Sequence, residues 1–270
     1  MEYNVLLDGL NDQQREAVLH KDGSLLVISG PGSGKTTILT RRIAYLLNES
    51  KGETFKILAL TFTTKAANEM KERIEKYVGN DVKRLFIGTF HSFCCDVLRK
   101  YGSYIGIDNE FTLYENNGEY IQLLIEAIQD ELARSDSKYR DILMKFKEDA
   151  VLRNSVQGIY AKIIQLKNRL IAPAEIHQVG SNFSEDFRVM YQLYNEKLRA
   201  NNVVDFADLL FLSCKLFQER PFIGKQYRNV YRYLLIDEAQ DTNKAQFELI
   251  QALCGREHRN VFVVACEFAQ

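Results

Sequence analysis

Two short polar segments contain the residue types best suited to chemistry. The first is the glycine-rich segment 29–37, with the sequence SGPGSGKTT. Glycines let successive backbone N–H groups turn around a phosphate, a lysine adds a mobile positive charge, and a threonine hydroxyl is a hard oxygen ligand for Mg²⁺. We therefore predict a phosphate-binding loop, with Thr36 on the metal, formed by Gly30, Gly32, Ser33, Gly34, Lys35, Thr36 and Thr37.

The loop departs from the strict form of this motif at one position. Glycine is expected five residues before the last glycine, and Ser29 stands there instead. The alternative is a strand-to-helix turn that carries Gly-Lys-Thr without binding a phosphate. Such a match arises by chance roughly once in a hundred chains of this length, so phosphate binding is favoured.

The second segment is the acidic sequence DEAQD at 237–241, directly after the apolar run 233–236. An acidic pair at the end of a buried strand is costly without a partner, and a phosphate-bound Mg²⁺ would supply one. Asp237 would position the metal, and Glu238 would orient or deprotonate the attacking water. With Lys35 these two form the predicted catalytic set. The alternative is an acid-rich helix N-terminus, which the helix dipole also favours.

The elements that must position these residues follow from apolar periodicity. Near-continuous apolar runs predict buried parallel strands, and patterns of period 3.6 predict helices between them. This alternation indicates an α/β fold, with a parallel sheet flanked by helices. The predicted strands cover 24–28, 56–61, 84–89, 233–236 and 260–265.

Polar and aromatic residues follow two of these strands. Phe62, Thr63 and Lys65 come after the second strand, and Thr89 and His91 come at the end of the third. Ligands of parallel sheets gather at the carboxyl ends of strands, where an aromatic ring can stack on a base and a lysine can hold a phosphate. The alternative for Phe62 is a core position, and for His91 a hydrogen-bonded structural histidine.

The middle of the chain differs from both ends. Helical patterns dominate from 101 to about 201, at 119–132, 141–147, 155–170 and 185–200. We predict a helical insertion in the α/β domain, which gives a first part at 1–100, an inserted subdomain at 101–203 and a second part at 204–270. Near the N-terminus, Asn11 and Gln14 have the spacing of a capping box. Gln14 has a second interpretation, as an amide that binds an adenine edge.

Composition limits the class of protein. The chain has 270 residues, a hydrophobic fraction of 46%, a charged fraction of 26% and a net charge of −1, so any nucleic-acid contact must come from a local patch. No apolar run has the length of a membrane span, and no signal peptide is evident. We expect a cytoplasmic protein without a membrane partner. Five cysteines without CxxC spacing favour free thiols over a zinc site.

Six segments, in order, resemble motifs of the UvrD/Rep/PcrA type of superfamily 1 DNA helicases. They lie at 10–18, 30–37, 60–70 (LTFTTKAANEM), 87–93 (IGTFHSF), 205–210 (DFADLL) and 235–241 (LIDEAQD). The resemblance implies a RecA-like P-loop NTPase domain 1A with an all-helical insertion, 1B. It also implies ATP and Mg²⁺ as cofactors, and single-stranded DNA or a 3′-tailed duplex as partner, with possible repair or recombination proteins.

The same resemblance assigns roles to particular residues. Gln14 would contact the adenine, and Gln240 would join the nucleotide site. DNA contacts would come from Phe62, Thr63, Lys65, Thr89 and His91. In a complete enzyme, ATP hydrolysis would drive 3′-to-5′ translocation and unwinding.

Two departures from the family pattern concern the end of the chain. Cys266 stands where the family has aspartate, and Gln270 comes one residue late for a γ-phosphate sensor. A second RecA-like domain, with its arginines, does not follow in this sequence. Because an arginine finger contributes roughly 10³–10⁵ in rate, we expect weak ATP hydrolysis and no duplex unwinding by this chain alone. The alternatives are a non-catalytic nucleotide- or DNA-binding module and a P-loop phosphotransferase acting on a small molecule.

Overall fold

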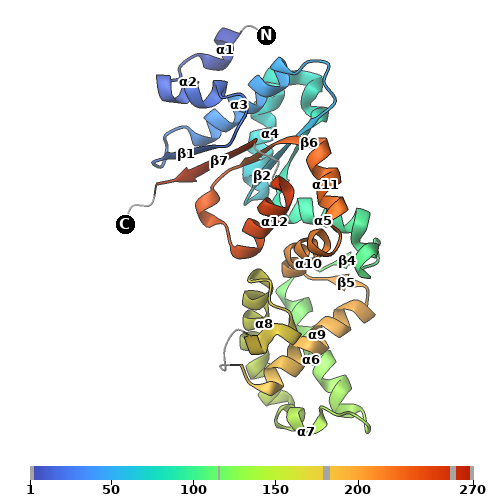
Figure 1. Ribbon diagram of the computed structural model, residues 1–270. Coiled ribbons are helices and arrows are strands. Elements are labelled where there is room, and N and C mark those ends of the chain that lie inside the picture. The colour runs from blue at the N-terminus through green and yellow to red at the C-terminus, as the bar shows by residue number, and fades with distance from the viewer. Residues whose placement is uncertain (1–2, 115, 179–182, 256–259, 268–270) are drawn as a thin grey trace. The chain divides into compact units, whose positions relative to one another are not determined.

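The computed structural model describes residues 3–114, 116–178, 183–255 and 260–267. Contacts divide the chain into two compact units (Figure 1). Unit 1 comprises 1–93, 220–242 and 246–270, and unit 2 comprises 94–219 and 243–245. These limits differ from the sequence-based subdomain limits at 100 and 203, because much of the helix after residue 89 and all of the helix after residue 205 belong to unit 2.

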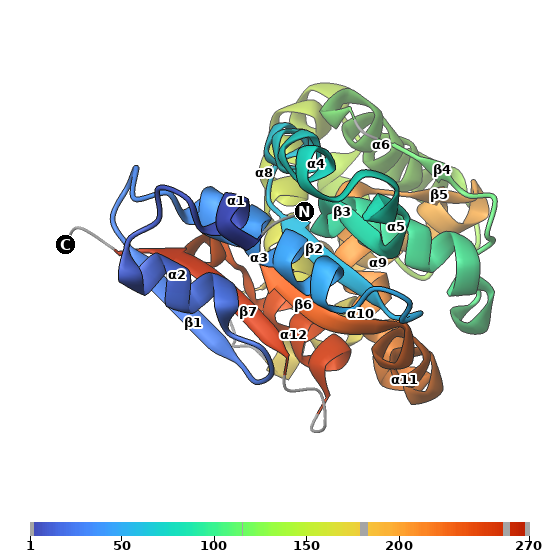
Figure 2. The same ribbon diagram turned by 90° about the horizontal axis from the view of Figure 1, so that it is seen from above.

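Unit 1 is built on a five-stranded parallel sheet (Figure 2). Its strands stand in the order β1-β7-β6-β2-β3, with all pairs parallel. All five predicted strands are present, as β1 (Leu25–Ser29), β2 (Lys56–Thr61), β3 (Leu85–Thr89), β6 (Tyr231–Ile236) and β7 (Val261–Cys266). Because the strands are parallel, their carboxyl ends share one edge of the sheet.

Burial in the sheet follows strand position. The central strands β2 and β6 are buried on both faces from their second or third residue onward, as expected for the middle of a parallel sheet. Strand β1 lies at the edge, and its burial alternates. Leu26 and Ile28 are 58% and 59% exposed, so apolar content predicted this strand but not its edge position.

Helices of unit 1 pack on the sheet or on one another. They are α1 (Tyr3–Leu7), α2 (Asp12–Leu19), α3 (Lys35–Glu49), α4 (Thr64–Val78), the start of α5 (Phe90–Tyr101), α11 (Pro221–Val230) and most of α12 (Lys244–Cys254). Helices α1 and α2 pack against α3. The apolar stripe of α3 is buried throughout, at Ile38, Leu39, Ile43, Leu46 and Leu47. Sequence patterns missed α5, which follows β3 without a turn, and α11, where only Ile223 and Gly224 are buried.

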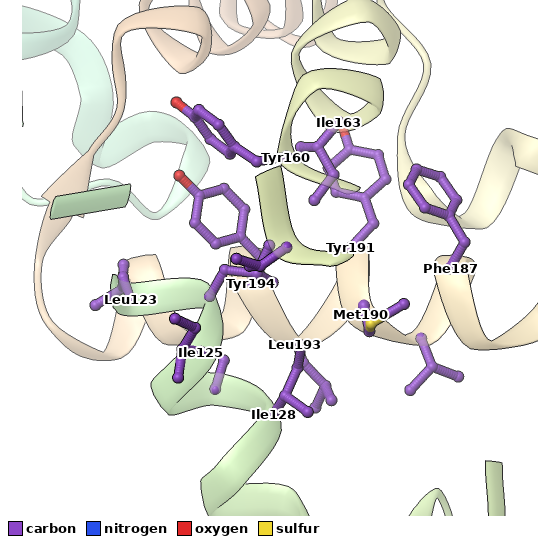
Figure 3. Close-up of a cluster of buried hydrophobic side chains, with 14 of the residues drawn as sticks. Leu123, Ile125, Ile128, Tyr160, Ile163, Phe187, Met190, Tyr191, Leu193 and Tyr194 are labelled. Atoms are coloured by element: carbon purple, nitrogen blue, oxygen red, sulfur yellow. The ribbon is translucent and has the colours of Figure 1, made fainter. Parts of the chain in front are cut away.

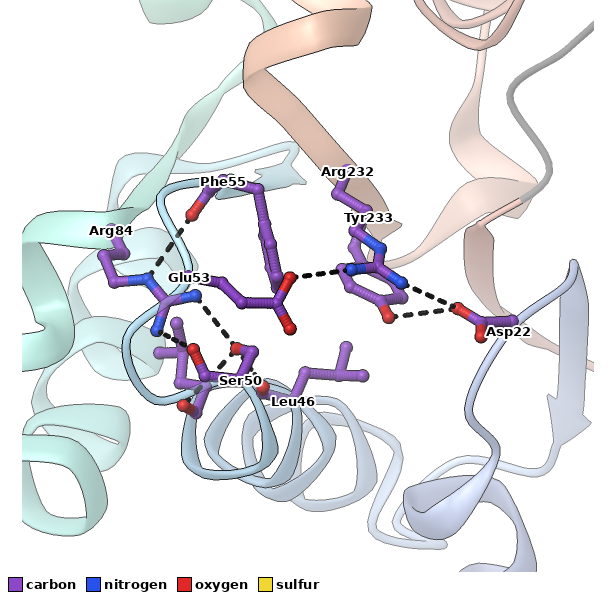
Figure 4. A network of polar contacts seen from close by, with 9 residues as sticks. Asp22, Leu46, Ser50, Glu53, Phe55, Arg84, Arg232 and Tyr233 are labelled. Carbon is purple, nitrogen blue, oxygen red and sulfur yellow. Dashed lines mark hydrogen bonds and ion pairs between the residues drawn. The ribbon is translucent and has the colours of Figure 1, made fainter.

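A network of polar contacts stabilises the amino-terminal edge of the sheet, which is opposite the carboxyl edge (Figure 4). The Arg232 guanidinium pairs with Glu53 at 2.9 Å, and the Tyr233 hydroxyl donates to Asp22 at 3.1 Å. Arg84 and Arg232 both lie over the Phe55 ring, at 4.9 and 5.1 Å from its centroid. These contacts join the loops before β1 and β2 to the starts of β3 and β6. They stabilise the sheet away from the predicted site.

Unit 2 has a helical core of its own (Figure 3). It contains most of α5, then α6 (Asn117–Ala133), α7 (Arg140–Leu143), α8 (Asp149–Asn168), α9 (Glu185–Ala200) and α10 (Phe206–Glu219). Aliphatic residues and tyrosines of α6, α8 and α9 fill the core. One short strand pair, β4 (Thr112–Leu113) with β5 (Val203–Val204), accompanies the helices. Two residues per strand are too few for periodicity to indicate them.

A buried ion cluster lies at the centre of unit 2. Lys167 on α8 contacts Asp205 at 2.6 Å and Asp208 at 2.8 Å, and Tyr194 on α9 donates to Asp205 at 2.9 Å. Asp205 also caps α10 by accepting the Asp208 N–H at 2.6 Å. Burial, together with the charge of Asp205, raises the pKa of Asp208 to about 6. The cluster therefore links α8, α9 and α10.

The structure also bears on the cysteines and on membrane-spanning helices. All five cysteines are free thiols, with Cys94 and Cys214 buried. In the part of the chain that the structure describes, no helix is both long and apolar enough to span a membrane.

Candidate nucleotide and DNA site

The glycine-rich loop joins β1 to α3 at the carboxyl edge of the sheet. Gly32 and Gly34 have positive φ values of 74° and 84°, which glycine adopts without a steric penalty. Helix α3 begins at Lys35, so the first backbone N–H groups of this helix, Lys35, Thr36 and Thr37, have no intrahelical acceptor. The loop therefore has the donors and the helix end that an anion requires.

Two side chains of the loop make hydrogen bonds to other residues of the same loop. The Lys35 ammonium donates to the Gly30 carbonyl oxygen at 3.1 Å. The Ser33 hydroxyl donates to the Ser29 hydroxyl at 2.7 Å. The serine that replaces the expected glycine thus contributes a bond that holds the loop turn. Lys35 is buried, with 7% of its surface exposed, and its ammonium can exchange the carbonyl for a phosphate oxygen.

The predicted metal ligands meet although they lie far apart in the sequence. Asp237 follows β6, and the Thr36 side chain lies close enough to its carboxylate to lower the pKa of that group. Only 3% of Asp237 is exposed. Burial raises the pKa of this carboxyl, and the charge of Glu238 raises it further, while Lys35 partly offsets both. A buried carboxylate beside a threonine hydroxyl and a helix N-terminus fits Mg²⁺ carrying phosphates.

Glu238 is held in an uncommon backbone conformation. Its φ of 50° and ψ of 42° place it in the left-handed region, at a cost of about 1–2 kcal/mol for a residue with a Cβ. Such strain persists where the surroundings fix it. Here the Glu238 N–H donates to Asp237 Oδ1 at 3.0 Å, and the Asp241 N–H donates to the Glu238 carbonyl oxygen at 3.0 Å. The Glu238 side chain is held separately by Gln240, whose Nε2 donates to Glu238 Oε2 at 2.7 Å. Gln240 follows on the short 3₁₀ turn Ala239–Asp241.

Gln14 has the capping role considered from the sequence, and its contact with an adenine stays a prediction. It completes a capping box with Asn11, at 2.8 and 3.0 Å. Its Nε2 also donates to the Ser33 carbonyl oxygen at 3.0 Å, so the amide reaches the phosphate loop. A cavity of about 470 Å³ lies beside it, between α2 and β1, lined among others by Gln14, His20 and residues 25–29. Its volume suits a nucleobase.

Two arginines of α3 that were not predicted from the sequence bind backbone carbonyl groups of the N-terminal segments. Arg42 on α3 is 1% exposed and donates to the carbonyl oxygens of Ala17 and Lys21, at 3.2 and 3.3 Å. Its guanidinium therefore caps the C-terminal end of α2 and also lies 4.8 Å from the Phe262 ring centroid. Arg41 donates to the Leu6 carbonyl oxygen at 3.2 Å. In the sequence, the sign that could have indicated these two arginines was their charge within an otherwise apolar helix face.

The predicted DNA-contacting residues stand at the ends of β2 and β3, on the same edge of the sheet. Thr63 caps α4 by accepting the Ala66 N–H at 3.1 Å, and Thr89 accepts the Ser92 N–H at 3.0 Å. Each hydroxyl keeps its own proton for a further acceptor. Two helix N-termini therefore point toward this edge beside the half-buried Phe62, whose ring lies 5.4 Å from that of Phe90. Lys65 is exposed.

His91 lies in the first turn of α5 and is partly buried. Burial lowers the pKa of His91 to about 4. Its imidazole is therefore neutral at physiological pH, and any contact with a nucleic acid would be a hydrogen bond rather than an ion pair.

The carboxyl end of β7 completes the edge. Cys266 pairs in register with Ser29 of β1, and the Cys266 N–H donates to Gln240 Oε1 at 2.8 Å. Glu267 continues the ladder by donating its N–H to the Ser29 carbonyl oxygen at 3.1 Å. Gln270, the predicted γ-phosphate sensor, lies outside the described residues.

A parallel RecA-like sheet with this loop and this acidic strand end defines an α/β domain of the P-loop class. Comparison with known sequences specifies the family. The profile of the UvrD/REP helicase N-terminal domain matches residues 10–266, and the chain belongs to this family.

Similar proteins include helicases from several bacteria. The chain is 40% identical over 256 residues to a probable DNA helicase II homolog of Mycoplasma capricolum, covering 94% of this chain and 33% of that protein. It is 37% identical to the ATP-dependent DNA helicase PcrA of Staphylococcus aureus, covering 97% and 33%. It is 38% identical to the ATP-dependent DNA helicase UvrD1 of Mycobacterium bovis, covering 93% and 31%. The chain thus spans about a third of the length of these relatives.

Proposed function

We propose that this chain is the ATP-binding and single-stranded-DNA-binding part of a 3′-to-5′ DNA helicase motor. The observation that carries the proposal is the proximity of Thr36, in the glycine-rich loop, to the buried carboxylate of Asp237. These residues come from opposite ends of the sequence and meet beside Lys35. The names of the relatives, which are ATP-dependent DNA helicases, support the same function.

Each group in the site has a proposed task. Lys35 and the N–H groups at the start of α3 bind the outer phosphates, and Gln14 lies on the adenine side. Thr36 and Asp237 hold Mg²⁺, which would neutralise charge on the phosphates. Glu238 orients the water that attacks the γ-phosphate and accepts its proton. Phe62, Thr63, Lys65, Thr89 and His91 contact a DNA strand at the neighbouring strand ends. In this proposal, translocation and unwinding are activities of a longer protein that contains this part.

The proposal is tested by nucleotide binding and turnover. We expect Mg²⁺-dependent binding of a fluorescent ATP analogue, and weak ATP hydrolysis that single-stranded DNA stimulates. Lys35→Ala removes the charge that binds the outer phosphates and abolishes both signals. Lys56→Ala, at the exposed amino-terminal end of β2, is the matched control and retains them. Equal nucleotide affinity in the parent and Lys35→Ala would contradict the assignment.

A second candidate is a module that binds nucleotide or DNA without turnover. The observation that favours it is Cys266, which stands level with Ser29 where the family pattern has an aspartate. DNA-stimulated hydrolysis that disappears in Lys35→Ala excludes this candidate. A small-molecule phosphotransferase is disfavoured by the family membership.

A further inference from the structure

We infer that Gln240 is a positioning residue for Glu238, rather than a contact to the nucleotide, and that it ties Glu238 to the end of strand β7. The inference rests on the proposed function, because it concerns the group that would orient the attacking water. It follows from three hydrogen bonds around one amide and from the backbone conformation of Glu238.

The hydrogen-bonding partners fix which way the Gln240 amide points. A backbone N–H can only donate, so the amide oxygen must face Cys266, whose N–H lies 2.8 Å from Oε1. The NH₂ group must then face the carboxylates. It donates to Glu238 Oε2 at 2.7 Å and approaches Asp241 Oδ2 at 3.4 Å. A flipped amide would set two acceptors against each other on one side and two donors on the other.

The same bonds leave little of this side chain for a nucleotide. Both NH₂ hydrogens face protein carboxylates, and the oxygen accepts a backbone N–H. The Glu238 backbone, with its φ of 50°, directs the carboxylate toward Gln240 across the 3₁₀ turn. Gln240 thus selects one orientation of the carboxylate.

The bridge also connects Glu238 with the strand beside the phosphate loop. Cys266 pairs in register with Ser29, and the next residue, Glu267, donates its N–H to the Ser29 carbonyl oxygen at 3.1 Å. The bond from Cys266 to Gln240 uses a backbone N–H. The unusual side chain at position 266 therefore leaves this connection intact.

Two substitutions at Gln240 distinguish its hydrogen bond to Glu238 from the one that it accepts from the Cys266 N–H. Gln240→Glu can still accept the Cys266 N–H but cannot donate to Glu238 when ionised. Gln240→Met has a similar length and makes neither bond. We expect kcat for DNA-stimulated ATP hydrolysis to fall about 10- to 100-fold in both variants, as for a misplaced catalytic group, while KM for Mg²⁺-ATP changes less than about threefold.

Hydrogen exchange of the Cys266 amide gives a readout independent of turnover. Exchange should accelerate about tenfold or more in Gln240→Met, since the acceptor is gone, and should stay near the parent rate in Gln240→Glu. The matched control is Gln251→Ala, an exposed glutamine on α12 that should leave kcat and exchange unchanged. Thermal melting of each variant establishes that it is folded.

The outcomes separate the inference from the proposed function. Unchanged kcat in both variants, with an active parent, would overturn the positioning role alone. A rise in KM with constant kcat would show that Gln240 contacts the nucleotide, and would overturn it too. A parent that binds Mg²⁺-ATP without hydrolysing it would overturn the catalytic part of the proposed function and the positioning role together, whereas Cys266 exchange would still report on the bridge.

Discussion

At the scale of single residues, we expect the buried carboxylate of Asp237 to have opposite effects on folding and on the proposed function. Its pKa is raised above the usual value of 3.8, chiefly by burial. A carboxyl whose folded-state pKa is raised binds protons more tightly when folded, so its contribution to stability falls as pH rises above 3.8 through the folded-state pKa. At neutral pH without Mg²⁺ this charge therefore opposes folding, and the metal would relieve it.

Asp237→Asn tests this trade-off. We expect the free energy of unfolding in Mg²⁺-free buffer at pH 7 to stay equal or to rise by on the order of 1 kcal/mol, because the amide removes the buried charge and keeps an acceptor. Mg²⁺-dependent ATP hydrolysis should be lost. Urea denaturation and a phosphate-release assay measure the two effects, with the exposed Asp136→Asn as control. A marked loss of stability in Asp237→Asn would contradict this account.

The contribution of His91 to stability depends on pH in the opposite direction to that of Asp237. Burial lowers the pKa of His91 from 6.5 to about 4. Between these values the unfolded chain binds the proton and the folded chain does not, so stability falls as pH drops from 6.5 toward 4. We expect the parent to lose more unfolding free energy than His91→Gln between pH 7 and pH 5, by on the order of 1 kcal/mol. Equal losses, measured by urea denaturation, would refute a buried neutral imidazole.

At the scale of elements, the direct junction of β3 with α5 depends on Gly88. A Cβ at this position would lie 2.5 Å from Ser92 Oγ and 2.9 Å from the Phe86 ring. The glycine lets the strand pass directly under the first turn of the helix, and so fixes where Thr89 and His91 stand.

Gly88→Ala should therefore lower the free energy of unfolding by about 1–3 kcal/mol through overpacking, and should weaken single-stranded DNA binding. Gly158→Ala is the matched control. Gly158 is exposed within α8 and has no atom within 4 Å of a built Cβ. The same change there should stabilise the chain by about 0.5–1 kcal/mol, because glycine is a poor helix former. Chemical denaturation gives both values, and equal signs would contradict the packing argument.

At the scale of the whole molecule, each unit has an apolar cluster of its own among the described residues, and the two clusters differ in chemistry. The cluster of unit 1 packs around the sheet. In unit 2, Tyr194 of the apolar cluster donates to Asp205, which forms a buried ion cluster with Lys167 and Asp208. Removal of one partner from a buried cluster leaves the remaining charge unbalanced. Damage to this cluster should therefore remain within unit 2.

We expect Lys167→Met to lower the stability of unit 2 by about 3–5 kcal/mol, since two buried carboxylates lose their counter-ion. Affinity of unit 1 for a fluorescent ATP analogue should not change. Hydrogen exchange of buried amides in α8 and α9, compared with those in β6, measures the difference. A parallel loss of protection in both groups of amides would show that the units unfold together.

The sequence by itself determined all five strands of the sheet, the phosphate loop, the acidic strand end and the family. These features depend on local patterns, namely continuous apolar runs, glycine spacing and charges directly after a strand. The capping roles of Asn11 and Asp205 were also predictable, because a cap is decided within four residues. Helix α5 was not, since it continues from β3 without a turn.

Only the tertiary structure decided which distant residues meet. The proximity of Thr36 to Asp237, the Arg42 cap on α2 and the bridge from Glu238 through Gln240 to Cys266 each join segments far apart in the chain. The order β1-β7-β6-β2-β3 places the last strand beside the first, and no local pattern contains that order. Strand pairing and burial arise from the packing of the whole sheet, so the surroundings of the loop at 29–37 became visible only in the folded chain.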